Sequence, residues 1–335
     1  MFNYANILIT GGTGSFGKAF VDLLLNKLKI KKIKRLVIYS RDEFKQSQFR
    51  NIYPANKYPC LRFFIGDVKD KDRLNRAMKN VNLVIHAAAL KQVAAAEYNP
   101  FEFVKTNIMG AQNVIETSLD NNVSNVIALS TDKASSPINL YGATKLCSDK
   151  LFISAQNYKG FAKIKFSVIR YGNVFGSRGS VIPLFLNQVK DKTPLTITDL
   201  NMTRFNITLN EASTYVLNKI KNNKGGEIFI PKLYSYKIED LVKALGKNLD
   251  YKIIGTRPGE KLHEEMISEE ESRNTLECKN DYVIVGSIHN LYKNSTLYKP
   301  VKKDFSYNSF KNLQYLSISQ IKKLIKNEKN NFDNL

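Results

Sequence analysis

The chain has 335 residues and a formal net charge of +21, and its length is sufficient for one large domain or two modest ones. No apolar stretch approaches the roughly 20 residues that span a bilayer, and a glycine turn by Gly11 leaves no room for a signal peptide, so we expect a soluble, cytoplasmic protein. Three cysteines far apart in sequence fit neither a disulfide framework nor a zinc site, and three dispersed histidines predict no metal cluster.

The first expected strand, Ile7–Thr10, is followed by a glycine-rich turn and then by apolar residues at helical spacing. The turn contains the pattern G-x-G-x-x-G at Gly12, Gly14 and Gly17. Between a strand and a helix, such glycines let the backbone approach a pyrophosphate, which is bound at the helix N-terminus. The sequence therefore predicts a dinucleotide site. The contacts predicted in this turn are Gly11, Thr13, Gly14, Ser15, Phe16 and Gly17.

The end of the second expected strand, Leu36–Tyr39, indicates which dinucleotide is bound. NAD-binding proteins usually place an acidic residue there for the ribose hydroxyls. Here the strand is followed by Ser40 and Arg41, with Lys45 soon after. A hydroxyl and two cations suit a 2′-phosphate, so the sequence favours NADP. Asp42 either contacts a ribose or caps the next helix.

Two further strands are expected at Leu61–Ile65 and Leu83–Ile85, each followed by residues that suit a cofactor. Asp67 either accepts a hydrogen bond from an adenine amino group or is a turn aspartate. His86 is expected to be packed rather than catalytic, and the three alanines after it permit close approach of a cofactor. Lys91 then lies where it suits a phosphate or a substrate hydroxyl. The contacts predicted here are Asp67, Val68, Ala87, Lys91 and, from the next long helix, Thr106.

The fifth expected strand ends in Thr131, Asp132 and Lys133, which bring a hydroxyl, a carboxylate and an amine together. Tyr141 and Lys145 follow, and their spacing of four places them on one face of a helix. A lysine beside a tyrosine lowers the pKa of the phenol, so Tyr141 could act as a base near neutral pH. Taken alone, the Thr-Asp pair could be a turn or a helix cap, and the tyrosine–lysine spacing also arises by chance.

The alternation of strands and helices over the first half of the chain predicts an α/β fold with a Rossmann-type, doubly wound parallel sheet. Ligands of such sheets bind at the carboxyl ends of the strands. Beyond Gly176 the pattern loosens, which indicates a smaller α/β substrate-binding domain. The predicted division is a Rossmann domain at 1–175 with a return segment at about 203–232, a substrate domain at 176–202 and 233–326, and a frayed tail at 327–335.

Together these motifs resemble the extended short-chain dehydrogenases/reductases, and within them the inverting UDP-N-acetylglucosamine 4,6-dehydratases that begin pseudaminic acid synthesis. The membrane-anchored relatives have N-terminal transmembrane helices and a methionine in place of Tyr141, whereas this chain resembles the soluble type. Gln92, Ala94 and Asn206 depart from the histidine, proline and aromatic residue usual in the family. The matching segments are Thr10–Gly17, Tyr39–Gln46, Phe63–Val68, His86–Lys91, Glu97–Pro100, Leu129–Lys133, Ile138–Lys150, Arg170–Val181, Met202–Phe205 and Arg257–His263.

The resemblance implies a hydro-lyase with tightly bound NADP that oxidises C4 of the sugar and so makes the C5 proton acidic. Tyr141, tuned by Lys145, would take the 4-hydroxyl proton, and Thr131 would hydrogen-bond the ketone. Lys133 would abstract the C5 proton in its neutral form, which burial and the nearby Lys145 cation would favour. A protonated Asp132 would donate to the leaving 6-hydroxyl. Hydride return to C6 and protonation of C5 from the opposite face would invert C5.

The resemblance also implies a substrate, an assembly and a pathway. The chain would bind UDP-N-acetylglucosamine and form a homo-oligomer, a hexamer in the family, and its product would serve glycosylation of flagellin or capsule. For Arg178, a cofactor contact and a solvated surface position are equally expected. Glu260 could form a surface ion pair with Lys261 instead of a substrate contact. The substrate contacts implied by resemblance are Lys91, Asn173, Val181, Arg204, Arg257 and Glu260, and Val174 is a further cofactor contact.

Three other functions were weighed. A UDP-sugar 4-epimerase or C5 epimerase would share the fold, Tyr141 and Lys145, but its expected site lacks the Asp132 and Lys133 pair. A catalytically inactive nucleotide-binding protein would not need these four residues. A nucleic-acid-binding module is disfavoured because the basic residues form no aromatic-interleaved block, although the charge would attract nucleotides.

Overall fold

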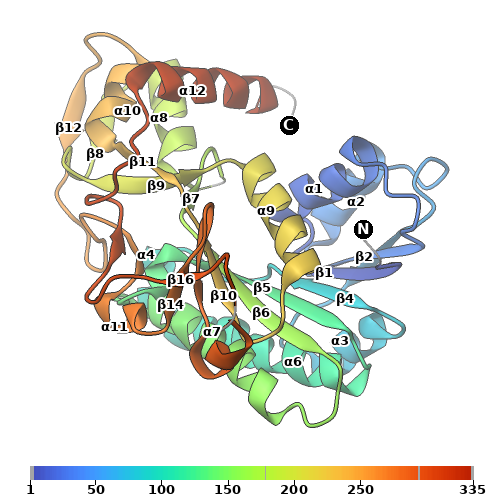
Figure 1. Cartoon of the computed structure of the whole chain (residues 1–335). Helices are drawn as coiled ribbons and strands as arrows, with labels where there is room; N and C mark the ends of the chain where they lie inside the picture. The colour runs from blue at the N-terminus through green and yellow to red at the C-terminus, as the bar shows by residue number, and fades with distance from the viewer. Residues whose placement is uncertain (1–3, 178, 293–294, 333–335) are drawn as a thin grey trace.

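The computed structural model describes residues 4–177, 179–292 and 295–332. The central strands of its largest sheet are short apolar runs that are buried on both faces. Its ten strands lie in the order β16-β14-β15-β10-β6-β5-β4-β1-β2-β3 (Figure 1). The strands are β1 (Asn6–Thr10), β2 (Arg35–Ser40), β3 (Leu61–Ile65), β4 (Leu83–His86), β5 (Asn125–Thr131), β6 (Lys165–Tyr171), β10 (Ile228–Pro231), β14 (Thr275–Glu277), β15 (Asp281–Ile284) and β16 (Lys299–Pro300).

Neighbouring strands from β3 to β10 pair in parallel, and β15, β14 and β16 extend the sheet antiparallel. From β1 the chain winds outward through β2 and β3 and then crosses to β4, so the strand order reverses between β1 and β4. Such a reversal opens a crevice at the carboxyl ends of the strands. The predicted Rossmann-type fold class is confirmed.

Helices cover both faces of this sheet, with α9 against α1 on one face and α6 between α3 and α7 on the other (Figure 1). The helical segments are α1 (Ser15–Asp22) with the π-helix Leu23–Lys27, α2 (Glu43–Ile52), α3 (Lys71–Met78), α4 (Val93–Tyr98), α5 (Pro100–Phe103) with the π-helix Val104–Met109, α6 (Gly110–Asp120), α7 (Leu140–Tyr158) and α9 (Leu209–Asn222).

A second apolar core lies beyond the sheet, at the upper left of Figure 1, where Phe185, Leu241 and Ile321 from three helices are buried together. Its elements are α8 (Val181–Lys190), β8 (Leu195–Ile197) with its partner strand β12 (Tyr251–Ile253), β11 (Tyr234–Lys237), α10 (Ile238–Leu245) and α12 (Ile318–Phe332). The remaining short segments are β7 (Asn173–Val174), β9 (Thr203–Ile207), β13 (Glu265–Ile267), α11 (Glu269–Ser272), the 3₁₀ segment Gly286–Tyr292 and β17 (Tyr307–Asn308).

Two segments differ from the predicted division. The strands β14, β15 and β16 belong to the large sheet although the prediction placed 233–326 in the smaller domain, because β15 pairs with the return strand β10. The predicted tail at 327–335 is helical as far as Phe332, and residues 333–335 lie outside the described part of the chain.

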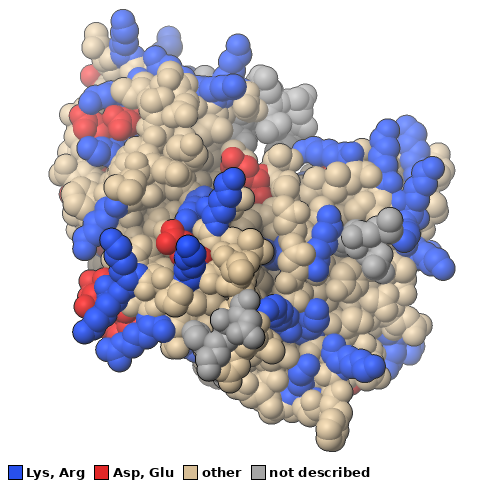
Figure 2. Space-filling view, viewed as in Figure 1, with Lys and Arg blue, Asp and Glu red and all other residues tan. Residues whose placement is uncertain are grey.

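The sequence predicts that the basic residues are spread over the surface. On the face seen in Figure 2, lysine and arginine side chains are scattered among uncharged residues rather than gathered in one block. Within the described residues, no helix is both long and apolar enough to cross a membrane.

Candidate active site

A cavity of about 1200 Å³ opens at the carboxyl ends of the parallel strands, between the large sheet and the second core. It is bordered by every residue predicted above as catalytic, cofactor-binding or substrate-binding, from Gly11 in the first turn to Glu260. Arg178 lies outside the described residues. The structure therefore brings together three sets of residues that are far apart in sequence.

The glycine turn forms one end of the cavity. Gly11 has a φ of +66°, which favours glycine, and its amide donates to the Tyr39 carbonyl. A Cβ on Gly17 would lie 2.4 Å from the Gly12 carbonyl oxygen, so a side chain there would push the helix away from the turn. The turn is thus a backbone cradle at the N-terminus of α1, and it fits the pyrophosphate of a dinucleotide.

The residues after β2 bring positive charge to this end. Asp42 caps α2 by accepting from the Lys45 amide at 2.9 Å and also pairs with the Lys45 ammonium, so the capping alternative is observed. Arg41 lies 3.5 Å from the Asp67 carboxylate. The Ser40 hydroxyl accepts from the Gln46 amide group at 3.0 Å. The two cations border the cavity as partly exposed side chains, each beside a carboxylate.

His86 behaves as a packed strand-end residue, as expected. Its Nδ1 lies 2.8 Å from the Thr10 hydroxyl, and its ring packs against Phe152. Burial lowers the pKa of His86 to about 3, so the imidazole stays neutral in the folded protein. The following Ala87, unlike His86, borders the cavity.

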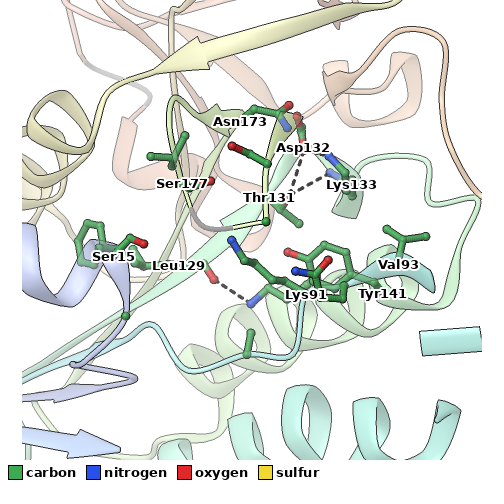
Figure 3. Close-up of a pocket in the computed structure, with 18 of the residues that line it drawn as sticks. Ser15, Lys91, Val93, Leu129, Thr131, Asp132, Lys133, Tyr141, Asn173 and Ser177 are labelled. Carbon is green, nitrogen blue, oxygen red and sulfur yellow. Dashed lines mark hydrogen bonds and ion pairs between the residues drawn. The ribbon is translucent and has the colours of Figure 1, made fainter. Parts of the chain in front are cut away.

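The end of β5 turns directly into a short 3₁₀ segment, Asp132–Ala134, which brings two adjacent side chains toward one site. The Asp132 Oδ1 atom accepts from the Thr131 hydroxyl at 2.9 Å and from the Lys133 ammonium at 3.0 Å. Figure 3 shows these three residues side by side, between Asn173 and Tyr141. A straight strand would have sent consecutive side chains to opposite faces of the sheet.

Lys133 has a second carboxylate partner that the sequence analysis missed. Glu264 is 2% exposed, and its Oε1 atom lies 3.0 Å from the Lys133 Nζ and 3.7 Å from the Arg204 Nε. The only signal in the sequence was a pair of acidic residues directly after His263, the last residue of the motif that begins at Arg257.

These contacts correct the expectation that the surroundings of Lys133 favour its neutral amine. Burial alone would lower the pKa of Lys133, but the carboxylates of Asp132 and Glu264 raise it above its usual value, so the resting side chain is an ammonium. Burial raises the pKa of Asp132, against the opposing effect of Lys133. Burial would likewise raise the pKa of Glu264, but Lys133 and Arg204 lower it. A proton shared in this cluster therefore resides on Asp132 in preference to Glu264.

Tyr141 and Lys145 lie in the first turns of α7, whose N-cap is Asn139, and both border the cavity. Burial raises the pKa of Tyr141 to about 12, and Lys133 and a hydrogen bond with Thr131 partly offset this effect. The prediction that Lys145 lowers the pKa of Tyr141 is wrong for this structure. Lys145 instead donates to the Leu129 carbonyl at 2.8 Å, and burial lowers its own pKa.

The substrate residues implied by resemblance border the same cavity, and Asn173 and Lys91 lie beside the Asp132 and Tyr141 groups (Figure 3). Asn173 has a buried Oδ1 atom without a hydrogen-bond partner among the described residues. Arg257 and Glu260 form a turn in which the Glu260 amide donates to the Arg257 carbonyl at 3.1 Å. Lys261 donates to the Ser135 carbonyl at 2.7 Å, so its ammonium is directed into the fold. Of the three departures from the family pattern, Gln92 and Ala94 border the cavity and Asn206 is buried in β9 beside Asn173.

Comparison with known proteins assigns the chain to a family. Residues 7–286 match the family model described as polysaccharide biosynthesis protein. The chain belongs to this family. Over 334 residues it is 52% identical to a Campylobacter jejuni protein named UDP-N-acetylglucosamine 4,6-dehydratase (inverting), with 97% of this chain and 98% of the relative covered. It is 45% identical to a Rickettsia bellii protein named UDP-glucose 4-epimerase, over 85% of this chain and 84% of the relative.

The solved structures agree on the fold. The X-ray structure of Pen from Bacillus thuringiensis superposes with a TM-score of 0.88 at 38% identity, covering 98% of this chain and all of that one. A dTDP-glucose 4,6-dehydratase from Streptomyces venezuelae, with NAD bound, superposes over 77% of this chain and 86% of that one, with a TM-score of 0.69 at 22% identity. The predicted resemblance to the extended short-chain dehydrogenases/reductases, and within them to the inverting UDP-N-acetylglucosamine 4,6-dehydratases, is confirmed.

Proposed function

We propose that the chain is an inverting UDP-N-acetylglucosamine 4,6-dehydratase that uses NADP. The observation that carries the proposal is the Asp132–Lys133 pair, held at 3.0 Å in the same cavity as Tyr141 and Lys145. Oxidation at C4 needs only a base and a hydride acceptor, whereas loss of water from C5 and C6 also needs a second base and an acid. The inverting dehydratase of C. jejuni, at 52% identity, supports the same assignment.

The fit of a dinucleotide rests on the cradle formed by the glycine turn at the N-terminus of α1. When bound, the nicotinamide ring supplies the hydride acceptor and donor. Arg41 and Lys45 would hold the 2′-phosphate of NADP, and Tyr141 and Lys145 would contact the nicotinamide ribose. The nucleotide released from denatured protein, identified by mass spectrometry, tests this part, and Arg41→Asp is expected to shift the preference toward NAD.

The Asp132–Lys133 contact accounts for both protonation states that elimination requires. Transfer of one proton from the Lys133 ammonium to the Asp132 carboxylate, across 3.0 Å, gives a neutral amine and a neutral acid together. Lys133 then takes the C5 proton, and Asp132 gives its proton to the departing 6-hydroxyl, which leaves as water. The elimination thus regenerates the ammonium and carboxylate of the resting site. Proton transfers of this kind contribute about 10²–10⁴-fold each to a rate.

The other groups would orient the substrate. Tyr141 would take the proton of the 4-hydroxyl, helped by Lys133 and Thr131, which both favour its ionised form. Arg204 and Arg257 suit the diphosphate of UDP, because guanidinium groups bind phosphate oxygens in a fork. The product would be UDP-2-acetamido-2,6-dideoxy-β-L-arabino-hex-4-ulose. We further propose that a homo-oligomer of the chain supplies it for pseudaminic acid synthesis.

Proton NMR of the purified protein with UDP-N-acetylglucosamine in D₂O, without added cofactor, tests the reaction. A new C6 methyl signal, deuterium at C5 and the arabino configuration are expected. The relative named UDP-glucose 4-epimerase makes a 4-epimerase the second candidate. Formation of UDP-N-acetylgalactosamine without a methyl signal would establish that candidate and overturn the dehydratase. If nothing changes, the same spectrum recorded with added NADP⁺ identifies a cofactor lost in purification.

A further inference from the structure

Glu264 has no role in the function proposed above, although it touches two residues of that site. It lies in the loop before β13, and its carboxylate reaches across the cavity wall to the turn after β5. The Oε1 atom is 3.0 Å from the Lys133 ammonium and 3.7 Å from the Arg204 guanidinium. The Oε2 atom is buried and has no hydrogen-bond partner among the described residues. A buried carboxylate in this setting costs free energy unless nearby cations compensate it.

We infer that Glu264 is a positioning residue that keeps the shared proton on the Asp132–Lys133 pair and ties this pair to Arg204. The inference rests on the proposed function, because it is the elimination that needs the pair to hold one proton. The cluster alternates in sign from the Asp132 carboxylate through the Lys133 ammonium and the Glu264 carboxylate to the Arg204 guanidinium.

The electrostatic reason is that Glu264 is negative next to both members of the pair. Its charge raises the pKa of Asp132 and also the pKa of Lys133. The pair therefore keeps its proton to a higher pH than it would without Glu264, and a pair that has lost the proton cannot protonate the leaving hydroxyl. Besides Glu264, the charged or titratable groups that face Lys133 are Lys91, Asp132, Tyr141, Arg204, Tyr236 and Lys261.

The test is the pH dependence of kcat in Glu264→Gln, with Glu265→Gln as the matched control. Glu265 accepts from the Ser136 hydroxyl at 2.7 Å and does not border the cavity. In Glu264→Gln the alkaline limb of the profile is expected to move about 1–3 pH units lower, which is the usual effect of an opposite charge at this distance. Glu265→Gln is expected to keep the wild-type profile. A Glu264→Gln enzyme whose alkaline limb does not move would overturn the inference.

A second variant separates charge from position. Glu264→Asp keeps the charge but withdraws the carboxylate by one methylene, so its alkaline limb should move less than that of Glu264→Gln. Its kcat should fall by about 10²-fold, because the shorter side chain lets the Lys133 ammonium shift, and small displacements of a catalytic group have large effects. If Glu264→Gln fails to fold, Glu264→Asp still decides, since a variant with both wild-type kcat and wild-type pH profile would refute the role.

The inference can also be tested without turnover. In protein labelled with ¹³C at the lysine Cε, the Lys133 signal is identified by its loss in Lys133→Arg. In the wild type this signal should keep its ammonium position to a higher pH than in Glu264→Gln, and equal titrations would contradict the inference. Failure of the wild type to release water from UDP-N-acetylglucosamine would reject the proposed function instead, and the two failures are therefore distinguishable.

Discussion

Two clusters of buried charge flank strand β5, and they differ in which of their buried atoms lack a hydrogen-bond partner within the described part of the chain. Behind the strand, Arg170 is fully buried, and its Nη1 atom donates to both oxygens of Glu271, at 2.8 and 3.0 Å. Its Nη2 donates to Asp149 at 3.3 Å, and Asp149 also accepts from Ser130 at 2.8 Å. This scaffold cluster joins β5, β6, α7 and α11, and its charged residues Arg170, Asp149 and Glu271 do not border the cavity.

The site cluster on the cavity side of β5 is formed by Asp132, Lys133, Arg204 and Glu264 and has unpartnered acceptors, whereas the unpartnered buried atom of the scaffold cluster is a donor, the Arg170 Nε. One oxygen of Asp132 and one of Glu264 have no hydrogen-bond partner among the described residues. A satisfied buried network makes a structure rigid, whereas unused acceptors at a cavity wall are available to a ligand. The comparison teaches that burial and charge alone do not mark a functional site. Unpartnered acceptors on residues that border the cavity distinguish the site cluster from the scaffold cluster.

The largest expected effect comes from removing the cation of the site cluster. Lys133→Gln keeps a donor for Asp132 but cannot accept the C5 proton, so turnover should fall by about 10²–10⁴-fold. Its stability should change less than that of a scaffold variant, because burial raises the pKa of Asp132, which can then take up a proton, and Glu264 keeps Arg204 as a partner. Coupled measurement of kcat and of urea unfolding checks both statements. Turnover within tenfold of the wild type would remove Lys133 from the proposed mechanism.

The matched change in the scaffold cluster is Arg170→Met. It leaves the Asp149 and Glu271 carboxylates buried without their cation, and the free energy of unfolding should fall by about 3–5 kcal/mol. Urea denaturation of this variant beside Lys133→Gln measures the contrast directly. A loss below about 1 kcal/mol would show that the scaffold cluster does not stabilise the fold, and it would contradict the contrast between the two clusters.

Local sequence patterns were sufficient for most of the fold and for the position of the site. The glycine turn before α1 and the strand ends at Asp67 and Thr131 could be predicted because each depends on a few consecutive residues. The partners of Lys133 could not, because Glu264 approaches from a distant loop with no periodic pattern. The expected neighbour, Lys145, was inferred from sequence proximity, yet in the fold its ammonium is bound to the Leu129 carbonyl. Protonation states depend on such long-range contacts.

Strands β14 and β15 show the same limit at the level of the fold. The sequence analysis placed their residues in the smaller domain, and only pairing of β15 with β10 assigns them to the large sheet. The helix α12 continues into the predicted tail, as far as Phe332, and its apolar face, including Ile321 and Ile325, packs in the second core. In both cases the deciding interaction joins segments that are far apart in the chain.

His86 sharpens the comparison, because it is a buried titratable group that stays uncharged. Its pKa is about 3 in the folded protein and near 6.5 when unfolded, so both states are neutral above pH 6.5. As the pH falls below 6.5, only the unfolded state takes up the proton, and stability should fall by about 1.4 kcal/mol per pH unit until the pH approaches 3. His86→Gln should remove this part of the slope. Unfolding free energies of both proteins at pH 5 and 7 measure the difference, and equal slopes would contradict it.

The smallest expected effect is also the most local test, because Ser130 and Thr131 are adjacent on β5 and serve different clusters. Ser130 donates to Asp149 in the scaffold cluster, and Thr131 donates to Asp132 in the site cluster. Ser130→Ala should therefore cost about 1 kcal/mol of stability with kcat unchanged. Thr131→Val should lower kcat with a smaller loss of stability, since its hydrogen bond lies at the cavity wall. Measured together, the two variants should show opposite patterns, and the same pattern in both would mean that β5 does not separate a structural from a functional network.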